Sequence, residues 1–152
     1  SAFESSLVRM VDLLRAIARG EHRGGEGEPP AVVAVLSGDI HFAYAARLEV
    51  TGTASRVHQL VSSPIRNPLP RTDRRVLRFA LGRTGRAISR ALLRTTGRAH
   101  LPTTWQLEHG PEFANEMGLL EIDGRSMQFV LERARPGDDE TEVLETVVRT
   151  PL

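Results

Sequence analysis

The stretch AVVAVLSGDIHFAYAARLEV (residues 31–50) combines two strand-like runs with a short polar loop between them. Residues 31–36 are continuously apolar and rich in β-branched side chains, which is typical of a short strand buried on both faces. Residues 42–50 predict a second strand. The intervening SGDIH places an acid and a histidine directly after the first strand, where α/β folds commonly keep their functional residues.

The patterns on either side of this stretch predict an order of helix, strands, helices and further strands. Residues 118–134 carry the clearest local signal, because Asp123 and Gly124, a favoured pair for a type I′ turn, join two strand-like runs. The other predicted elements are an amphipathic helix over 3–18, strands over 57–63, 102–108 and 142–149, and a helical region over 73–95 that Gly82 and Gly85 divide or kink. A helix is the alternative for residues 142–149. We therefore expect an α/β fold of the α+β kind, with a mixed or largely antiparallel sheet flanked by helices in one domain.

The composition of the 152 residues is that of a globular domain, with 40% hydrophobic and 26% charged residues. No cysteine is present, which excludes disulfides and thiolate metal sites. No apolar run approaches the roughly 20 residues of a membrane-spanning helix, so we predict no membrane span. All 20 basic residues are arginine. Asp73 is the only acid between Arg56 and Arg98, whereas acids dominate residues 108–145, so the middle of the chain is basic and its last third acidic.

Asp39 and His41 are candidate metal ligands. If the chain continues extended past the strand, residues two apart point to the same side, and the two side chains face one pocket. A carboxylate and an imidazole suit Zn, Mn or Fe, and Gly38 permits a tight turn or a close approach to a ligand. Two ligands are too few for a catalytic metal, so a turn aspartate beside a half-buried histidine is an equally good interpretation of these residues alone.

Arg66 and Asn67 lie in PIRNPLPRT (residues 64–72), where three prolines predict an irregular loop. A guanidinium can bind two phosphate oxygens at once, and we predict a substrate-binding role for this pair. The alternative is that Asn67 caps a turn and Arg66 pairs with a nearby acid. No base accompanies Ser62 or Ser63 in the local sequence, so neither is predicted to be a nucleophile.

The runs VVAVLSGDIHFAYAARLEV and VHQLVSSPIRNPL resemble the C-terminal part of the PhoD-like metallophosphatases (the alkaline phosphatase D family). WQLEHGPEFANEMGLLEIDGRSMQFVLE is similar to the closing hairpin region of that family, so the resemblance extends over residues 31–133. It implies half of a four-layer αββα fold, in a phosphatase that hydrolyses phosphomonoesters or phosphodiesters with a metal-activated water. It also implies that His41 binds a metal ion, with Fe, Mn, Zn or Ca as candidates, and that Asp39 either binds metal or orients His41 or the substrate.

In the wider metallophosphoesterase superfamily the last ligand motif is commonly Gly-His-x-His, and the earlier motifs include an Asp-x-His and an Asn-His. His41 matches the second histidine of the last motif, whereas Asp39 stands where the first would be. The earlier motifs are not found before residue 35. We therefore expect residues 1–152 to be the C-terminal portion of a larger catalytic domain, inactive without its N-terminal remainder. A sheet cut in this way could also associate as a homodimer.

The arginine-rich residues 71–98 support an alternative of another class, a non-catalytic module that binds nucleic acid or another polyanion. Only Phe79 lies among these arginines for base stacking, and no DNA-binding motif is present, so nucleic acid is the less favoured partner. A simpler interpretation is a solvated helical face that pairs with the acidic last third of the chain. The histidines outside the SGDIH motif are interpreted as ordinary structural or surface residues: His22, His58, His100 and His109.

Overall fold

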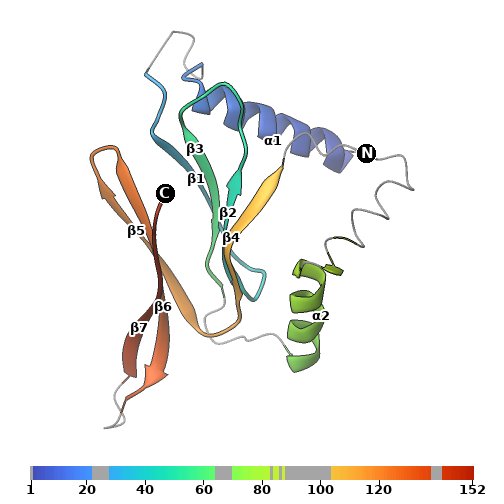
Figure 1. Ribbon diagram of the computed structural model, residues 1–152, viewed down its shortest axis with the longest axis vertical. Helices are drawn as coiled ribbons and strands as arrows, with labels where there is room; N and C mark the ends of the chain where they lie inside the picture. The colour runs from blue at the N-terminus through green and yellow to red at the C-terminus, as the bar shows by residue number, and fades with distance from the viewer. Residues whose placement is uncertain are drawn as a thin grey trace.

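The computed structural model describes residues 2–21, 28–63, 70–82, 84–85, 87, 104–137 and 142–152. The elements in chain order are α1 (Ala2–Ala18), β1 (Val32–Ser37), β2 (Ala43–Leu48), β3 (Arg56–Val61), α2 (Arg71–Leu81), β4 (Trp105–Glu112), β5 (Glu116–Asp123), β6 (Ser126–Pro136) and β7 (Glu142–Pro151). They form two sheets, with strand orders β1-β3-β2-β4 and β5-β6-β7 (Figure 1). The expected α+β class is confirmed. Two sheets replace the single expected sheet, because β5 pairs with β6 instead of joining the first four strands.

The first sheet (β1–β4) is mixed. β1 runs parallel to β3, with Ser37 opposite Val61, and β2 runs antiparallel to both β3 and β4. Among the described strands, β1 therefore has only β3 as a neighbour and lies at the sheet edge. The predicted burial of this strand on both faces is wrong, since Leu36 is 65% exposed and residues 32–35 are only half-buried.

The second sheet (β5–β7) is an antiparallel meander. β5 and β6 pair as far as Asp123 and Ser126, which confirms the predicted hairpin. The two-residue loop consists of Gly124 and Arg125, one position later than predicted. Gly124 has a φ of 55° at the first loop position, whereas Arg125 at the second is not among the residues with positive φ, and this combination suits a type II′ turn rather than the expected type I′. β7 pairs with β6 and confirms the strand predicted over residues 142–149.

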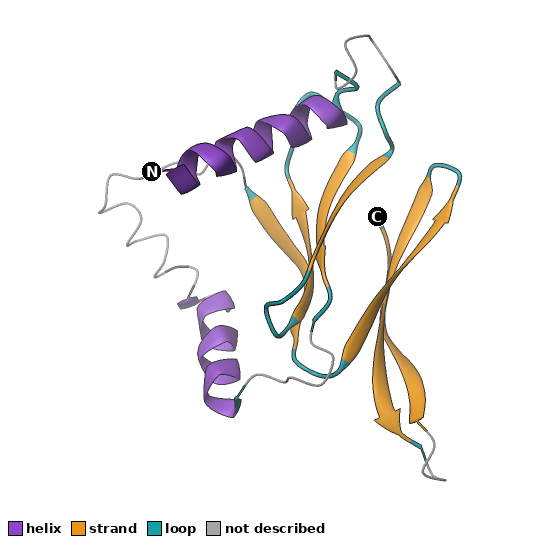
Figure 2. Cartoon of the chain, turned by 180° about the vertical axis from the view of Figure 1, so that it is seen from behind, coloured by secondary structure: helices purple, strands orange, loops and turns teal. Residues whose placement is uncertain are grey.

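Small side chains allow the two sheets to pack closely. Ala43 and Ala45 of β2 are fully buried in one cluster with Phe129 and Leu131 of β6. Alternate residues of a strand point to one face, so these positions place one side of each sheet in a shared core. Leu152, which follows β7, is buried in the same cluster. Figure 2 shows the resulting layers, with the helices on the side of the first sheet that faces away from the second.

α1 covers part of that outer face of the first sheet. Val11, Leu14 and Ala18 are buried at a spacing of three and four residues, and the last two pack against residues of β2 and β3. This confirms the predicted amphipathic helix. Met10, which the sequence pattern also places on the inner stripe, is 43% exposed, so the buried stripe is narrower than expected. Neither of the described helices is long and apolar enough to cross a membrane.

Candidate functional site

Two segments that carry predicted site residues leave the first sheet at the same end. β1 and β3 are parallel, and the amide of Ser62 donates to the carbonyl of Ser37 at 3.3 Å. The SGDIH loop after β1 and the segment that begins with Ser62 after β3 therefore start side by side. β4 also ends here, since Glu112 pairs with Ala43 at the start of β2. This end of the first sheet is the candidate site.

The SGDIH loop is bent. Asp39 and His41 have φ values of 63° and 61°, in the left-handed region. The extended geometry assumed from the sequence is therefore wrong, and strand alternation does not decide where the two side chains point. Left-handed backbone costs L-residues about 1–2 kcal/mol each, although Asp and His adopt it more readily than most. Two such residues in one short loop indicate a conformation imposed by the surroundings, which is common at functional sites.

Contacts at both ends hold this loop. A side chain at Gly38 would lie 3.5 Å from the carbonyl oxygen of Ser62, so the start of the loop packs against the end of β3. Phe42 stacks on Tyr44 with ring centroids 5.7 Å apart and lies 5.9 Å from the ring of Phe113. Phe113 is itself buried directly after β4. An aromatic cluster therefore anchors the end of the loop next to His41.

The donor atoms of Asp39 and His41 fit a divalent or trivalent metal in kind but not in number. Across the part of the chain that the structure describes, no group of three or more His, Asp or Glu side chains is arranged to hold a metal ion. Arg66 and Asn67, the predicted substrate-binding pair, lie outside the described residues. The metal and substrate sites are therefore not tested by the structure, and a complete metal site needs further ligands.

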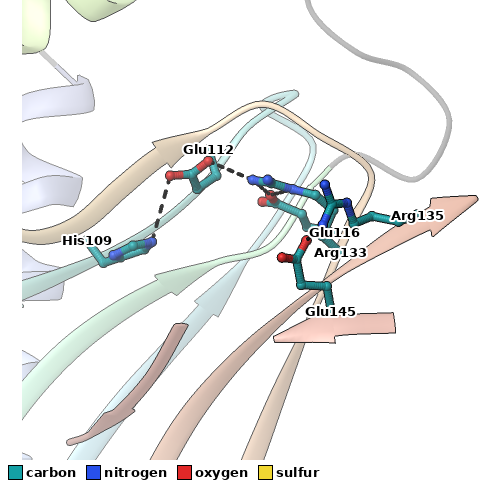
Figure 3. Close-up of polar contacts among 6 residues, drawn as sticks. All are labelled: His109, Glu112, Glu116, Arg133, Arg135 and Glu145. Carbon is teal, nitrogen blue, oxygen red and sulfur yellow. Dashed lines mark hydrogen bonds and ion pairs between the residues drawn. The ribbon is translucent and has the colours of Figure 1, made fainter. Parts of the chain in front are cut away.

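An acid–arginine cluster that the sequence analysis missed lies beside this end of the sheet (Figure 3). Arg133 of β6 donates to Glu116 at 3.0 and 2.8 Å and to Glu112 at 3.0 Å, which joins β4, β5 and β6. The Glu116 side chain is fully buried, and burial raises the pKa of its carboxyl although the Arg133 guanidinium opposes this shift. The hydrogen bond to Glu116 in turn raises the pKa of Arg133. The partners are 17 and 21 residues apart, so no local pattern signals them.

β4 changes register opposite the start of β2. Ala45 pairs with His109 and Ala43 with Glu112, and irregularities flank Ala45 on both sides. Gly110 lies between them with a φ of 92°, and a side chain there would come within 2.7 Å of the Ala43 carbonyl oxygen. Bulges of this kind redirect side chains and are common beside active sites. The Gly-Pro pair in EHGPE is the sequence signal for the bulge, because both residues interrupt regular strands.

Two of the remaining histidines pair with glutamates of β4. His58 is buried on β3, with Nδ1 at 3.1 Å from Oε2 of Glu108. Burial lowers the pKa of the His58 imidazole, although the Glu108 carboxylate acts in the opposite direction. Nε2 of His109 lies 3.9 Å from Oε1 of Glu112 (Figure 3). These contacts fit the structural role predicted for both histidines.

Most of the described part of the arginine-rich segment forms α2, none of whose residues is buried. α2 ends at Leu81, where Gly82 is predicted to interrupt the helix, and the guanidinium of Arg78 lies 5.3 Å from the centroid of the Phe113 ring. Acids of the last third of the chain pair with arginines of the second sheet: Glu116 with Arg133, Glu145 with Arg135 and Glu121 with Arg149. Polyanion binding by the arginine-rich segment stays an untested alternative.

Comparisons of the chain with protein-family models, with curated proteins and with solved structures find no significant match. The resemblance to metallophosphatases therefore rests on the quoted motifs alone. The structure by itself defines an α+β protein of two packed sheets, with a loop of strained backbone after the first strand.

Proposed function

We propose that residues 1–152 form the C-terminal part of a metal-dependent phosphatase that hydrolyses phosphate esters. The observation that carries this proposal is the common starting point of two segments, SGDIH after β1 and SSPIRNP after β3, at one end of the first sheet. The carboxyl ends of parallel strands open to the same side, where α/β proteins commonly bind ligands. A stretch that resembles a metal-binding motif thus begins beside the segment that carries the predicted substrate-binding pair, Arg66 and Asn67.

Four residues of this chain have proposed roles in the reaction. Asp39 and His41 would hold metal, and bound metal, with Fe, Mn, Zn and Ca as candidates, supplies Lewis acidity and an activated water. Arg66 would bind phosphate oxygens through its planar guanidinium, and Asn67 would donate to them through its amide. The constrained backbone at Asp39 and His41 supports these roles, because a side chain held in place before binding loses less freedom when the ligand arrives.

The edge position of β1 supports the proposal that an N-terminal remainder completes the domain. An apolar strand that runs parallel to its neighbour is usually covered on both faces. β1 has β3 as its only neighbour among the described strands, and Leu36 is 65% exposed. A strand of the remainder beside β1 would cover this edge, and the remainder would contribute the further metal ligands. Residues 1–152 alone are therefore expected to be inactive.

The test is hydrolysis of 4-nitrophenyl phosphate by the full-length protein, assayed with each candidate metal. We expect His41→Ala to lower kcat/KM by at least about a hundredfold and to reduce the bound metal measured by elemental analysis, because the variant loses a ligand. His22→Ala is the matched control, since His22 belongs to no ligand motif, and it should keep both activity and metal. Full activity of His41→Ala would refute the site, and an inactive wild-type protein with all four metals would refute the function.

A further inference from the structure

A cavity of about 460 Å³ lies between α2 and the outer face of the first sheet. Tyr44 and Ala46 of β2 line it, and they alternate along the strand with Ala43 and Ala45, which are buried between the sheets. The cavity is therefore separate from the core of the protein. Its volume is in the range of about 300–1,000 Å³ that is usual for small-molecule sites.

The wall of this cavity is apolar and aromatic. The rings of Phe42, Tyr44 and Trp105 line the sheet side, and Leu77 and Leu81 of α2 line the other. Among the described residues that line the cavity, only Tyr44, Trp105 and Gln59 carry polar side-chain groups, namely a hydroxyl, an indole N–H and an amide. Burial raises the pKa of Tyr44, so its hydroxyl is a neutral donor at physiological pH. An apolar wall with a few polar groups suits an aryl or alkyl group that carries one oxygen.

The cavity begins at the candidate site. Phe42 lines it and directly follows His41 in the SGDIHF sequence, and Pro111 of the β4 bulge lines it as well. We propose that the cavity binds the aryl or alkyl group of an ester whose phosphate lies at the SGDIH loop, an assignment that rests on the proposed function for its phosphate half. The substrate class is then a phosphate ester of an apolar alcohol. The cavity is open to solvent on one side, and β2, β3, β4 and α2 supply most of its lining residues.

The experiment measures binding of the alcohol by itself. Trp105 is the only tryptophan and lines the cavity, so 4-nitrophenol bound there should quench its fluorescence in a saturable way. Ala80→Phe places a ring into the cavity from α2, a helix without buried residues, where the change is compatible with folding. We expect this variant to weaken 4-nitrophenol binding by about tenfold or more, because the added ring takes the space of the ligand.

Thr72→Phe is the matched control. Thr72 is exposed on the same helix, about 12 Å from Ala80 along the axis, and does not line the cavity. The Thr72→Phe variant should therefore bind 4-nitrophenol with the affinity of the wild-type protein. Equal affinity in Ala80→Phe, or no saturable quenching in wild type, would overturn the proposal. Self-association through this face would also overturn the proposal. It would appear as a change in Trp105 fluorescence with protein concentration, measured without 4-nitrophenol, and Ala80→Phe would abolish that change.

Hydrolysis by the full-length protein separates this inference from the proposed function. Phenyl phosphate and glycerol phosphate present the same phosphate group with an apolar and a polar alcohol. A kcat/KM at least about tenfold higher for phenyl phosphate, lost in Ala80→Phe, supports the substrate class. Equal values for the two esters would refute the cavity assignment and leave the phosphatase proposal intact. Failure to hydrolyse either ester, with 4-nitrophenol still bound, would refute the phosphatase and keep the cavity as an apolar binding site.

Discussion

Arg133→Met should destabilise the fold by about 2–3 kcal/mol near neutral pH, because it leaves Glu116 as a buried carboxylate without its ionic partner. Removing one member of a fully buried ion pair costs about 3–5 kcal/mol. The cost expected here is smaller, since Arg133 is 30% exposed and water screens part of the interaction, although the Glu116 side chain is fully buried. Methionine keeps much of the apolar length of arginine, so packing changes little.

The destabilisation caused by Arg133→Met should decrease as the pH falls. Burial raises the pKa of Glu116 above its ordinary value of 4.5, so the folded state favours the protonated carboxyl and loses stability as pH rises through and above that value. Arg133 is the group that limits this shift. Without it the folded-state pKa rises further, and the variant takes up its proton at a higher pH. The difference between wild type and Arg133→Met is therefore largest near neutral pH and smallest near about pH 4.5.

Urea unfolding followed by circular dichroism at about pH 7.5 and about pH 5 measures both effects. Arg135→Met is the control on the same strand, because Arg135 pairs with Glu145 at 3.0 Å while both side chains are exposed (Figure 3). It should cost about 0–1 kcal/mol, with little change between the two pH values. Equal costs for the two variants, or a cost of Arg133→Met that grows toward low pH, would refute this account of the cluster.

Two further predictions concern a buried histidine and the edge of the first sheet. His58→Gln should flatten the pH dependence of stability below about pH 6.5, because burial lowers the pKa of His58 and its protonation costs the folded state stability as pH falls below that value. Urea unfolding of wild type and His58→Gln at several pH values below about 6.5 measures this pH dependence. Parallel plots of unfolding free energy against pH would contradict the prediction. Leu36→Lys should keep residues 1–152 monomeric where the wild-type chain dimerises, because a lysine on edge strand β1 blocks edge-to-edge pairing. Sedimentation velocity distinguishes monomer from dimer, and a monomeric wild-type chain would contradict the prediction.

Local sequence patterns were sufficient to predict most of the described elements. The β5–β6 hairpin was predictable because its alternating strands and its glycine turn lie within one short segment, although the turn lies one residue later than expected. α1 was predictable because Val11, Leu14 and Ala18 repeat at the helical period. For the candidate site, the sequence identified SGDIH as the loop after a strand. In each case the determining residues are near neighbours in the chain, so propensity and periodicity contain the information.

The tertiary structure alone decided the environment of these elements. The apolar residues of β1 predict burial on both faces, but the strand lies at a sheet edge because strand order depends on pairing between distant segments. The left-handed backbone of Asp39 and His41 depends on the packing of the loop between the end of β3 and the aromatic cluster. The contacts of Arg133 join three strands across 17 and 21 residues of sequence. Composition and periodicity determine which residues can be buried. Contacts between residues that are remote in sequence decide which of these residues meet and how strained the backbone is at those positions.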